Sequence, residues 1–243
     1  MTGTDPGRRL STPARSSARR GARDAGLSPD AIVDVALELI EREGTGALTV
    51  RRLGAELAVD PTAFYRHFRD KDDLVLACMD RAEQLAFDAL RRRTDSLSWQ
   101  DTLRAVADEN WRMAETYPAI YASAFARITG GPGERAVVEL VLSRIAELGL
   151  DRPTTVLFYR SFVDTVLSLA GGNAVVQHLG PDILAKDEST WGRVYAQLPP
   201  EKHPATHAHA TELGAVSDRA IYAHVVETLI AAMETAAGRA QAR

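Results

Sequence analysis

The sequence has a single cysteine, Cys78, and aromatic residues make up only 6% of its 243 positions. One cysteine excludes an intrachain disulfide and a cysteine-rich zinc site, which suits a reducing compartment. No apolar run approaches the roughly 18 uninterrupted residues that a membrane helix needs, and residues 1–10 have no apolar signal core. We therefore expect a cytoplasmic protein that does not contact a membrane.

Sequence motifs of common catalytic and cofactor sites are also missing. There is no Gly-rich phosphate loop, HExxH, GxSxG or dinucleotide fingerprint, and we interpret Gly44-Thr45-Gly46 as a turn. His203 and His207 would share one face of a helix, which suggests a metal site. Pro204 and the lack of carboxylates at matching spacing argue against it. We expect no enzyme activity, no cofactor and no bound metal.

The overall charge is unfavourable for a nucleic-acid binder, with a net charge of −4 and a pI of about 5.9. Residues 1–26 differ, because they carry six arginines against two aspartates and almost no large apolar residue. Such a leader cannot form a core, and we expect it to be disordered on its own. It is either a solvated tail or an arm that follows a phosphate backbone or enters a minor groove.

The rest of the chain is typical of an all-α protein, since no segment shows strand alternation or an internal repeat. Ser28-Pro29-Asp30 is a strong helix start, and Gly44 or Gly46 would end that helix. Its buried stripe would consist of Ile32, Ala36, Leu39 and Ile40. Four acids, Asp30, Asp34, Glu38 and Glu41, share the opposite face of this helix.

Further helices are expected along the chain. The expected segments are a long helix capped by Asp70 and Asp73, then residues 98–117, a short helix from Pro118, residues 135–148, a helix from Pro153 that Gly171-Gly172 interrupts, and residues 212–237. Residues 180–210 are expected to be irregular, because they are rich in Pro, His and Asp. The last helix would bury a stripe of Ile221, Val225, Leu229, Ala232 and Ala236.

The stretch Leu48–Leu74 predicts two short helices joined by a tight turn. Thr49 suits the N-cap of the first, and the pair Asp60-Pro61 would start the second. Phe64 and Phe68 would anchor the second helix from behind and leave its outer face polar. Ala58 occupies the turn position that glycine usually holds, and a left-handed conformation would cost an alanine ~1 kcal/mol there.

This stretch, LTVRRLGAELAVDPTAFYRHFRDKDDL, resembles the DNA-binding segment of the tetracycline-repressor-like (TetR) family. The resemblance rests on the leading Leu-Thr, the Leu-Ala-Val turn, the Tyr-Arg-His-Phe run, and a lysine followed by acids and a leucine. It implies a helix-turn-helix that places its second helix in the DNA major groove. The implied DNA contacts are Thr49, Arg51, Pro61, Thr62, Ala63, Tyr65, Arg66, His67 and Lys71.

The resemblance also implies a homodimer formed through the last two long helices, although one chain could bury these apolar faces by itself. It implies an effector pocket in the C-terminal region, for an apolar or aromatic small molecule. The aromatic-rich candidates for its lining are Trp111, Met113, Tyr117, Tyr121, Phe125, Phe158 and Phe162.

We therefore expect a leader (residues 1–26), a three-helix DNA-binding domain (27–72) and a helical effector-binding and dimerisation domain (73–243). The expected function is that of a transcriptional regulator, more simply a repressor, that a small molecule releases from a palindromic double-stranded DNA operator. Two alternatives stay open at this point. The chain could be a small helical enzyme, or an interaction module in which the helix-turn-helix only packs.

Overall fold

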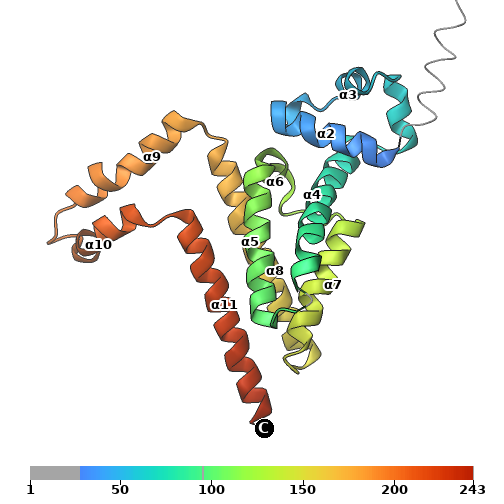
Figure 1. Cartoon of the computed structure of the whole chain (residues 1–243). Coiled ribbons are helices and arrows are strands. Elements are labelled where there is room, and N and C mark those ends of the chain that lie inside the picture. Colours follow the sequence, from blue (N-terminus) through green and yellow to red (C-terminus); the bar gives the residue numbers. More distant parts are fainter. Residues whose placement is uncertain (1–27, 95, 243) are drawn as a thin grey trace, which may run out of the picture.

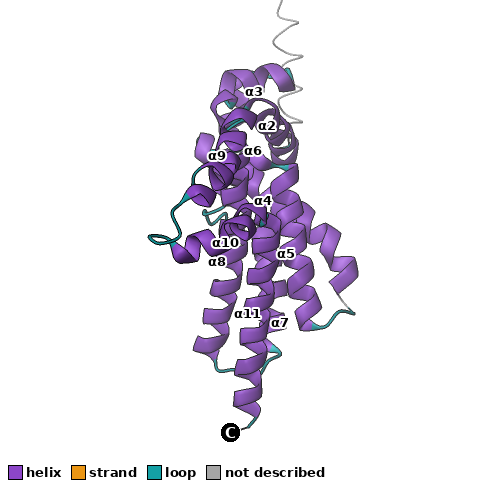
Figure 2. Cartoon of the chain, turned by 90° about the vertical axis from the view of Figure 1, so that its left-hand side faces the viewer, coloured by secondary structure: helices purple, strands orange, loops and turns teal. Residues whose placement is uncertain are grey.

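The computed structural model describes residues 28–94 and 96–242, without the side chains of Thr62, Ala63 and Arg92. Every element within this range is helical, which confirms the all-α fold class (Figure 2). Figure 1 shows a small N-terminal group of helices above a central bundle, with a helical arm on one side. The predicted properties of the leader, residues 1–26, lie outside the described residues.

The N-terminal group, which we call the head, begins with α2 (Pro29–Glu43) and η1 (Thr45–Ala47). The Ser28 hydroxyl caps α2 by accepting a hydrogen bond from the Ala31 amide, and Gly44 ends the helix with a φ of 80°. All members of the predicted stripe of this helix are buried. The head continues with α3 (Val50–Leu57) and η2 (Pro61–Arg66).

The central bundle contains α4 (Lys71–Thr94), α5 (Trp99–Thr116), α6 (Pro118–Ala124), α7 (Pro132–Ala146) and α8 (Arg152–Gln177). Ser98 caps α5 and Tyr117 ends it, as predicted. Asp80 of α4 fixes the start of α7, because its carboxylate accepts hydrogen bonds from the amides of Gly133 (3.2 Å) and Glu134 (2.9 Å). The long helix α4 itself runs from the head into the bundle (Figure 1).

The predicted interruption at Gly171-Gly172 is wrong, since α8 continues through both glycines. Gly171 serves packing instead. A Cβ atom at this position would lie 2.1 Å from Cγ of Phe125, so only glycine lets α6 and α8 approach this closely. Nothing lies within 4 Å of a Cβ placed on Gly172, so only the first glycine is required by this contact.

The prediction of an irregular segment over residues 180–210 is also wrong. The chain forms α9 (Pro181–Arg193), η3 (Tyr195–Gln197) and α10 (Pro204–Ala215), which project as the arm in Figure 1. Both long helices start with proline in the first turn, where the missing N–H costs nothing. Pro204 therefore opens a helix instead of preventing one.

The last helix, α11 (Asp218–Gln241), starts six residues later than the predicted residue 212, because Ser217 provides its N-cap. Its buried stripe is shifted by one position along most of its length, and Ile221 of the predicted stripe is 40% exposed. The buried residues are Tyr222, Val226, Ile230, Met233 and Ala237. In the part of the chain that the structure describes, no helix has the length and apolar character needed to cross a membrane.

Candidate nucleic-acid interface and ligand cavity

The turn between α3 and η2 has the predicted geometry. Ala58 is left-handed, with φ of 52° and ψ of 38°, and is the only non-glycine residue with positive φ in the described ranges. The Val59 amide donates to the Gly54 carbonyl at 3.0 Å, which closes the end of α3. The Thr49 hydroxyl caps the start of α3 by accepting from the Arg52 amide at 3.1 Å.

The second helix of the motif is held from behind by aromatic packing. Phe64 is 5% exposed and stacks on Phe68, with ring centroids 5.5 Å apart. Gly54 allows the start of η2 to approach α3, because a Cβ there would lie 3.2 Å from Cα of Pro61. The helix itself is a 3₁₀ helix and ends at Arg66, so it is tighter and shorter than the α-helix expected from the sequence.

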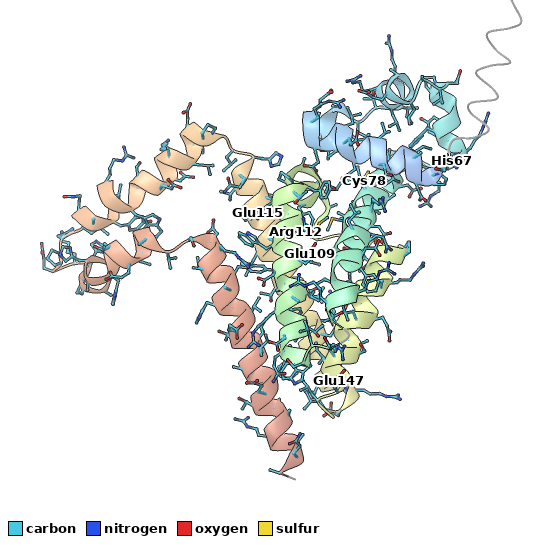
Figure 3. The ribbon with its side chains drawn as sticks, viewed as in Figure 1. His67, Cys78, Glu109, Arg112, Glu115 and Glu147 are labelled. Carbon is cyan, nitrogen blue, oxygen red and sulfur yellow. The ribbon has the colours of Figure 1, made fainter. Side chains whose placement is uncertain are left out.

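The opposite side of the motif is open to solvent. Tyr65 is 60% exposed, and no ion pair of Arg51 or Arg66 occurs within the described part of the chain. In Figure 3, His67 lies at the outer edge of the head. The predicted contact residues with an exposed, described side chain are Thr49, Arg51, Pro61, Tyr65, Arg66, His67 and Lys71. The side chains of Thr62 and Ala63 lie outside the described residues.

The excess acidic side chains of the head form ion pairs with arginines, and these pairs lie away from the open side. Arg42 and Arg52 bridge Glu43 and Glu56, which also joins α2 to α3. Arg81 of α4 pairs with Asp34 at 2.9 Å. Hydrogen bonds from the guanidinium groups of Arg52 and Arg42 to its carboxylate lower the pKa of Glu43. The unpaired cations therefore remain on the outer side, where a polyanion can reach them.

A cavity of about 70 Å³ lies inside the central bundle, and the space around it that opens to solvent brings the total to about 660 Å³. Every bundle helix contributes to its wall, as is common for ligand sites between helices. Its lining residues are Glu83, Ala86 and Leu90 of α4, Val106 and Asn110 of α5, Tyr121 of α6, Arg127 of the connection between α6 and α7, Glu134, Val137 and Val138 of α7, and Tyr159, Val163, Val166 and Leu167 of α8.

The predicted pocket residues are distributed over several places. Only Tyr121 lines the bundle cavity, whereas Trp111 lines a wider groove beneath the α9–α10 arm. Met113 and Phe162 are 1% and 0% exposed in the core, and Phe125 packs on Gly171. The last two, Tyr117 and Phe158, are partly buried against the core. Aromatic side chains at helical spacing thus mostly fill the core here.

The polar residues of the cavity were not predicted. Asn110 is held by neighbours, because its amide donates to the Val166 carbonyl at 3.1 Å and accepts from the Tyr121 hydroxyl at 3.2 Å. Glu83 has no such partner for Oε2, which is buried within the described structure. One sequence signal points to Glu83, since it precedes the buried Ala86 and Leu90 by three and seven residues and so shares their helix face.

The head contacts the start of α6, and a second ion pair lies where α4 leaves the head. The Glu41 carboxylate of α2 accepts hydrogen bonds from the amides of Ala119 (3.1 Å) and Ile120 (3.0 Å) at the start of α6. Burial raises the pKa of Glu41, although these two amides oppose the increase. Arg127, which lines the cavity, pairs with Asp72 in the first turn of α4 at 3.0 and 2.8 Å. The head is thus held directly against the start of α6.

Comparison with known proteins identifies relatives of this architecture. The family described as "Bacterial regulatory proteins, tetR family" matches residues 32–78. An HTH-type transcriptional regulator of Saccharopolyspora erythraea is 29% identical over 153 residues, which cover 63% of each chain. The HTH-type transcriptional repressor DrrR1 of Streptomyces coeruleorubidus is 28% identical over 130 residues, 54% of this chain and 47% of that one. The chain thus matches less than two thirds of the length of either relative.

Among solved structures, a crystal structure of the Streptomyces coelicolor TetR family protein ActR in complex with actinorhodin superposes with a TM-score of 0.74. The match covers 87% of this chain and 99% of ActR, at 20% sequence identity. At this identity the likeness concerns the fold. The structural match extends well beyond residues 32–78, where the sequence match to the family ends.

Proposed function

We propose that the chain, whose residues 32–78 match the TetR family of bacterial regulatory proteins, is a DNA-binding transcriptional regulator that a small molecule releases from its operator. The observation that carries the proposal is the open side of α3 and η2. Its cations are unpaired within the described structure, while Phe64 holds the motif in place from behind. Nothing in the described chain covers this side.

The contact residues divide into two groups in this proposal. Arg51, Pro61, Thr62, Ala63 and Tyr65 lie against base edges or thymine methyl groups. Thr49, His67 and Lys71 contact phosphates and set orientation, and Arg66 serves either purpose. The Nζ atom of Lys71 already donates to the Thr45 carbonyl at 2.6 Å, which fixes the side chain at the border between η1 and α4.

A homodimer fits the outer faces of α8 and α11. Leu157 is 68% exposed and Val156 is 51% exposed on α8, and Ile221 is exposed on α11. A two-fold axis would pair these helices with their copies in a four-helix bundle. Two heads spaced about 34–36 Å apart would then read successive major grooves of a palindrome.

Repression by occlusion is the simplest action of such a dimer, and the relative DrrR1 is named a repressor. The cavity of the bundle provides the effector site, and residues 27–72 and 73–243 would be the reading and the effector-binding domains. We place the protein in the cytoplasm because its proposed partner, operator DNA, lies there. An enzyme and a motif that serves only packing are not retained, since the relatives are regulators and the outer side of the motif is open.

The test is a fluorescence-anisotropy titration of the full chain with labelled intergenic DNA that flanks its own gene. We expect saturable binding that unlabelled random DNA of the same length does not displace at equal concentration. Arg51→Ala should reduce the preference for this DNA. A chain that binds both DNAs with equal affinity would disprove the proposed function.

A further inference from the structure

Three charged side chains line the cavity of the bundle, and two of them have partners. Arg127 forms a bidentate pair with Asp72. The Glu134 carboxylate accepts hydrogen bonds from the Thr129 hydroxyl, at 3.0 Å, and from the Gly130 amide. These two groups therefore serve the architecture around the mouth of the cavity and have no immediate need of a ligand.

Glu83 is different, because its Oε2 atom is shielded from solvent and finds no hydrogen-bond partner within the described structure. Burial, together with the nearby carboxylates of Glu134 and Asp80, raises the pKa of Glu83 to about 8. Asp80 does not relieve Glu83, since its two carboxylate oxygens already accept from the backbone amides of Gly133 and Glu134. A buried carboxyl oxygen without a hydrogen-bond partner is costly to keep, so its position in the wall of this cavity calls for an explanation.

We propose that the effector is an apolar molecule with a protonated amino group, and that this group binds the carboxylate of Glu83. The inference rests on the proposed function, because it names the chemistry of the effector. It also refines the expectation of a ligand with few polar anchors, since it assigns one acidic anchor at a defined place.

The rest of the cavity fits the apolar part of such a molecule. Its walls are formed mainly by aliphatic side chains from α4, α5, α7 and α8: Ala86, Leu90, Val106, Val137, Val138, Val163, Val166 and Leu167. An anionic ligand is disfavoured, because Glu83, Glu134 and Asp80 together give this end of the cavity a negative potential. A neutral ligand would leave the Glu83 carboxyl group protonated and would gain no ion pair with it. An ammonium group supplies both the charge and the donor that Oε2 lacks.

The proton balance of binding gives a second signature. Near neutral pH, Glu83 is mostly protonated in the free protein, because its pKa is about 8. A bound ammonium group stabilises the ionised form, so the carboxyl proton leaves to the buffer when the complex forms. Binding of an amine should therefore release close to one proton per site, whereas binding of an uncharged analogue should release none.

Isothermal titration calorimetry of the full chain tests the inference with two matched probes, naphthylethylamine and naphthylethanol, in buffers of different ionisation enthalpy. We expect the amine to bind the native protein about tenfold more tightly or better, with proton release. Glu83→Gln should abolish both the preference and the release. Glu83→Leu provides a second variant, and Glu139→Gln, an exposed change on α7, should leave both unchanged.

Equal affinities of the two probes for the native protein would overturn the inference, as would an amine preference that survives in folded Glu83→Gln or Glu83→Leu. Absence of binding by both probes would overturn it as well. Calorimetry needs no DNA, so these results are independent of the proposed function. A chain that binds its operator but not the amine contradicts only the assignment of the effector, whereas an amine-binding chain without operator preference contradicts only the role in transcription.

Discussion

Charged side chains without a partner lie in opposite environments in the head and in the bundle. On the outer side of the head, Arg51 and Arg66 are exposed to solvent and have no ion-pair partner within the described chain. In the bundle, Glu83 is partly buried, and its Oε2 atom is shielded from solvent without a hydrogen-bond partner among the described residues. Hydration makes the exposed cations inexpensive, whereas the buried acid costs stability until a ligand satisfies it. The exposed cations suit a partner that binds at the protein surface, and the buried acid suits a ligand that enters the cavity.

The pH dependence of stability provides the largest test of this contrast. The pKa of Glu83 is raised from 4.5 to about 8, so the folded protein holds this proton more tightly than the unfolded chain. Stability is therefore retained below pH 4.5 and lost as the pH rises towards 8, by up to about 1.4 kcal/mol per pH unit. Glu83→Gln removes this loss.

Urea unfolding of the native protein and of Glu83→Gln at several pH values measures the effect. We expect the difference in unfolding free energy to increase across this range in favour of the variant. Glu139→Gln, an exposed change on α7, should follow the native curve. Parallel curves for the native protein and Glu83→Gln would show that Glu83 is adequately solvated.

The next largest effect is expected where α8 meets α6. In Gly171→Ala the new Cβ would lie 2.1 Å from Phe125, so the helices must move apart, at a cost of about 1–3 kcal/mol or more. Gly172→Ala is the matched control, because its Cβ meets nothing within 4 Å and alanine favours a helix by up to about 1 kcal/mol. Thermal unfolding should show a decrease in Tm for the first variant only, and equal changes would argue against the close contact.

The head and the bundle also differ in how much of their structure can be predicted from the sequence. The head is built mainly from neighbouring residues, so helix caps and spacing predicted α2, α3 and the open side of the motif, and comparison with other helix-turn-helix motifs pointed to the turn at Ala58. The 3₁₀ form of η2 was not predicted, because caps and spacing locate a short helix without distinguishing a 3₁₀ helix from an α-helix. Roles of the individual contact residues stay predictions.

The cavity is assembled from residues 83–167 on several helices, so no local spacing identifies its lining. Aromatic content was a poor guide, since Met113 and Phe162 lie in the core. Gly171 misled the prediction because tertiary packing outweighed its low helix propensity. The one-residue shift of the stripe on α11 has a similar origin, because Tyr222 enters the core to donate to the Ala107 carbonyl at 2.8 Å.

The proposed separation of base contacts from phosphate contacts on the head predicts a moderate effect on DNA binding. Arg51→Ala should reduce discrimination between operator and altered sequences by about 1–3 kcal/mol, the value of a bidentate contact with guanine. Lys71→Ala should weaken binding to all sequences alike and reduce the salt dependence by about one phosphate contact. Anisotropy titrations at several salt concentrations separate the two, and an equal loss on specific and random DNA in both variants would contradict the division.

The smallest effect concerns the turn of the motif. Ala58 has a φ of 52°, a conformation that costs an L-residue with a Cβ about 1 kcal/mol relative to glycine. Ala58→Gly should therefore raise the Tm slightly. Ala55→Gly makes the same chemical change three residues earlier, inside α3, where glycine is less favourable than alanine by about 1 kcal/mol. Thermal unfolding should thus show shifts of opposite sign, because the backbone conformation alone decides the outcome at these exposed positions. Shifts of the same sign would mean that Ala58 is not left-handed in solution.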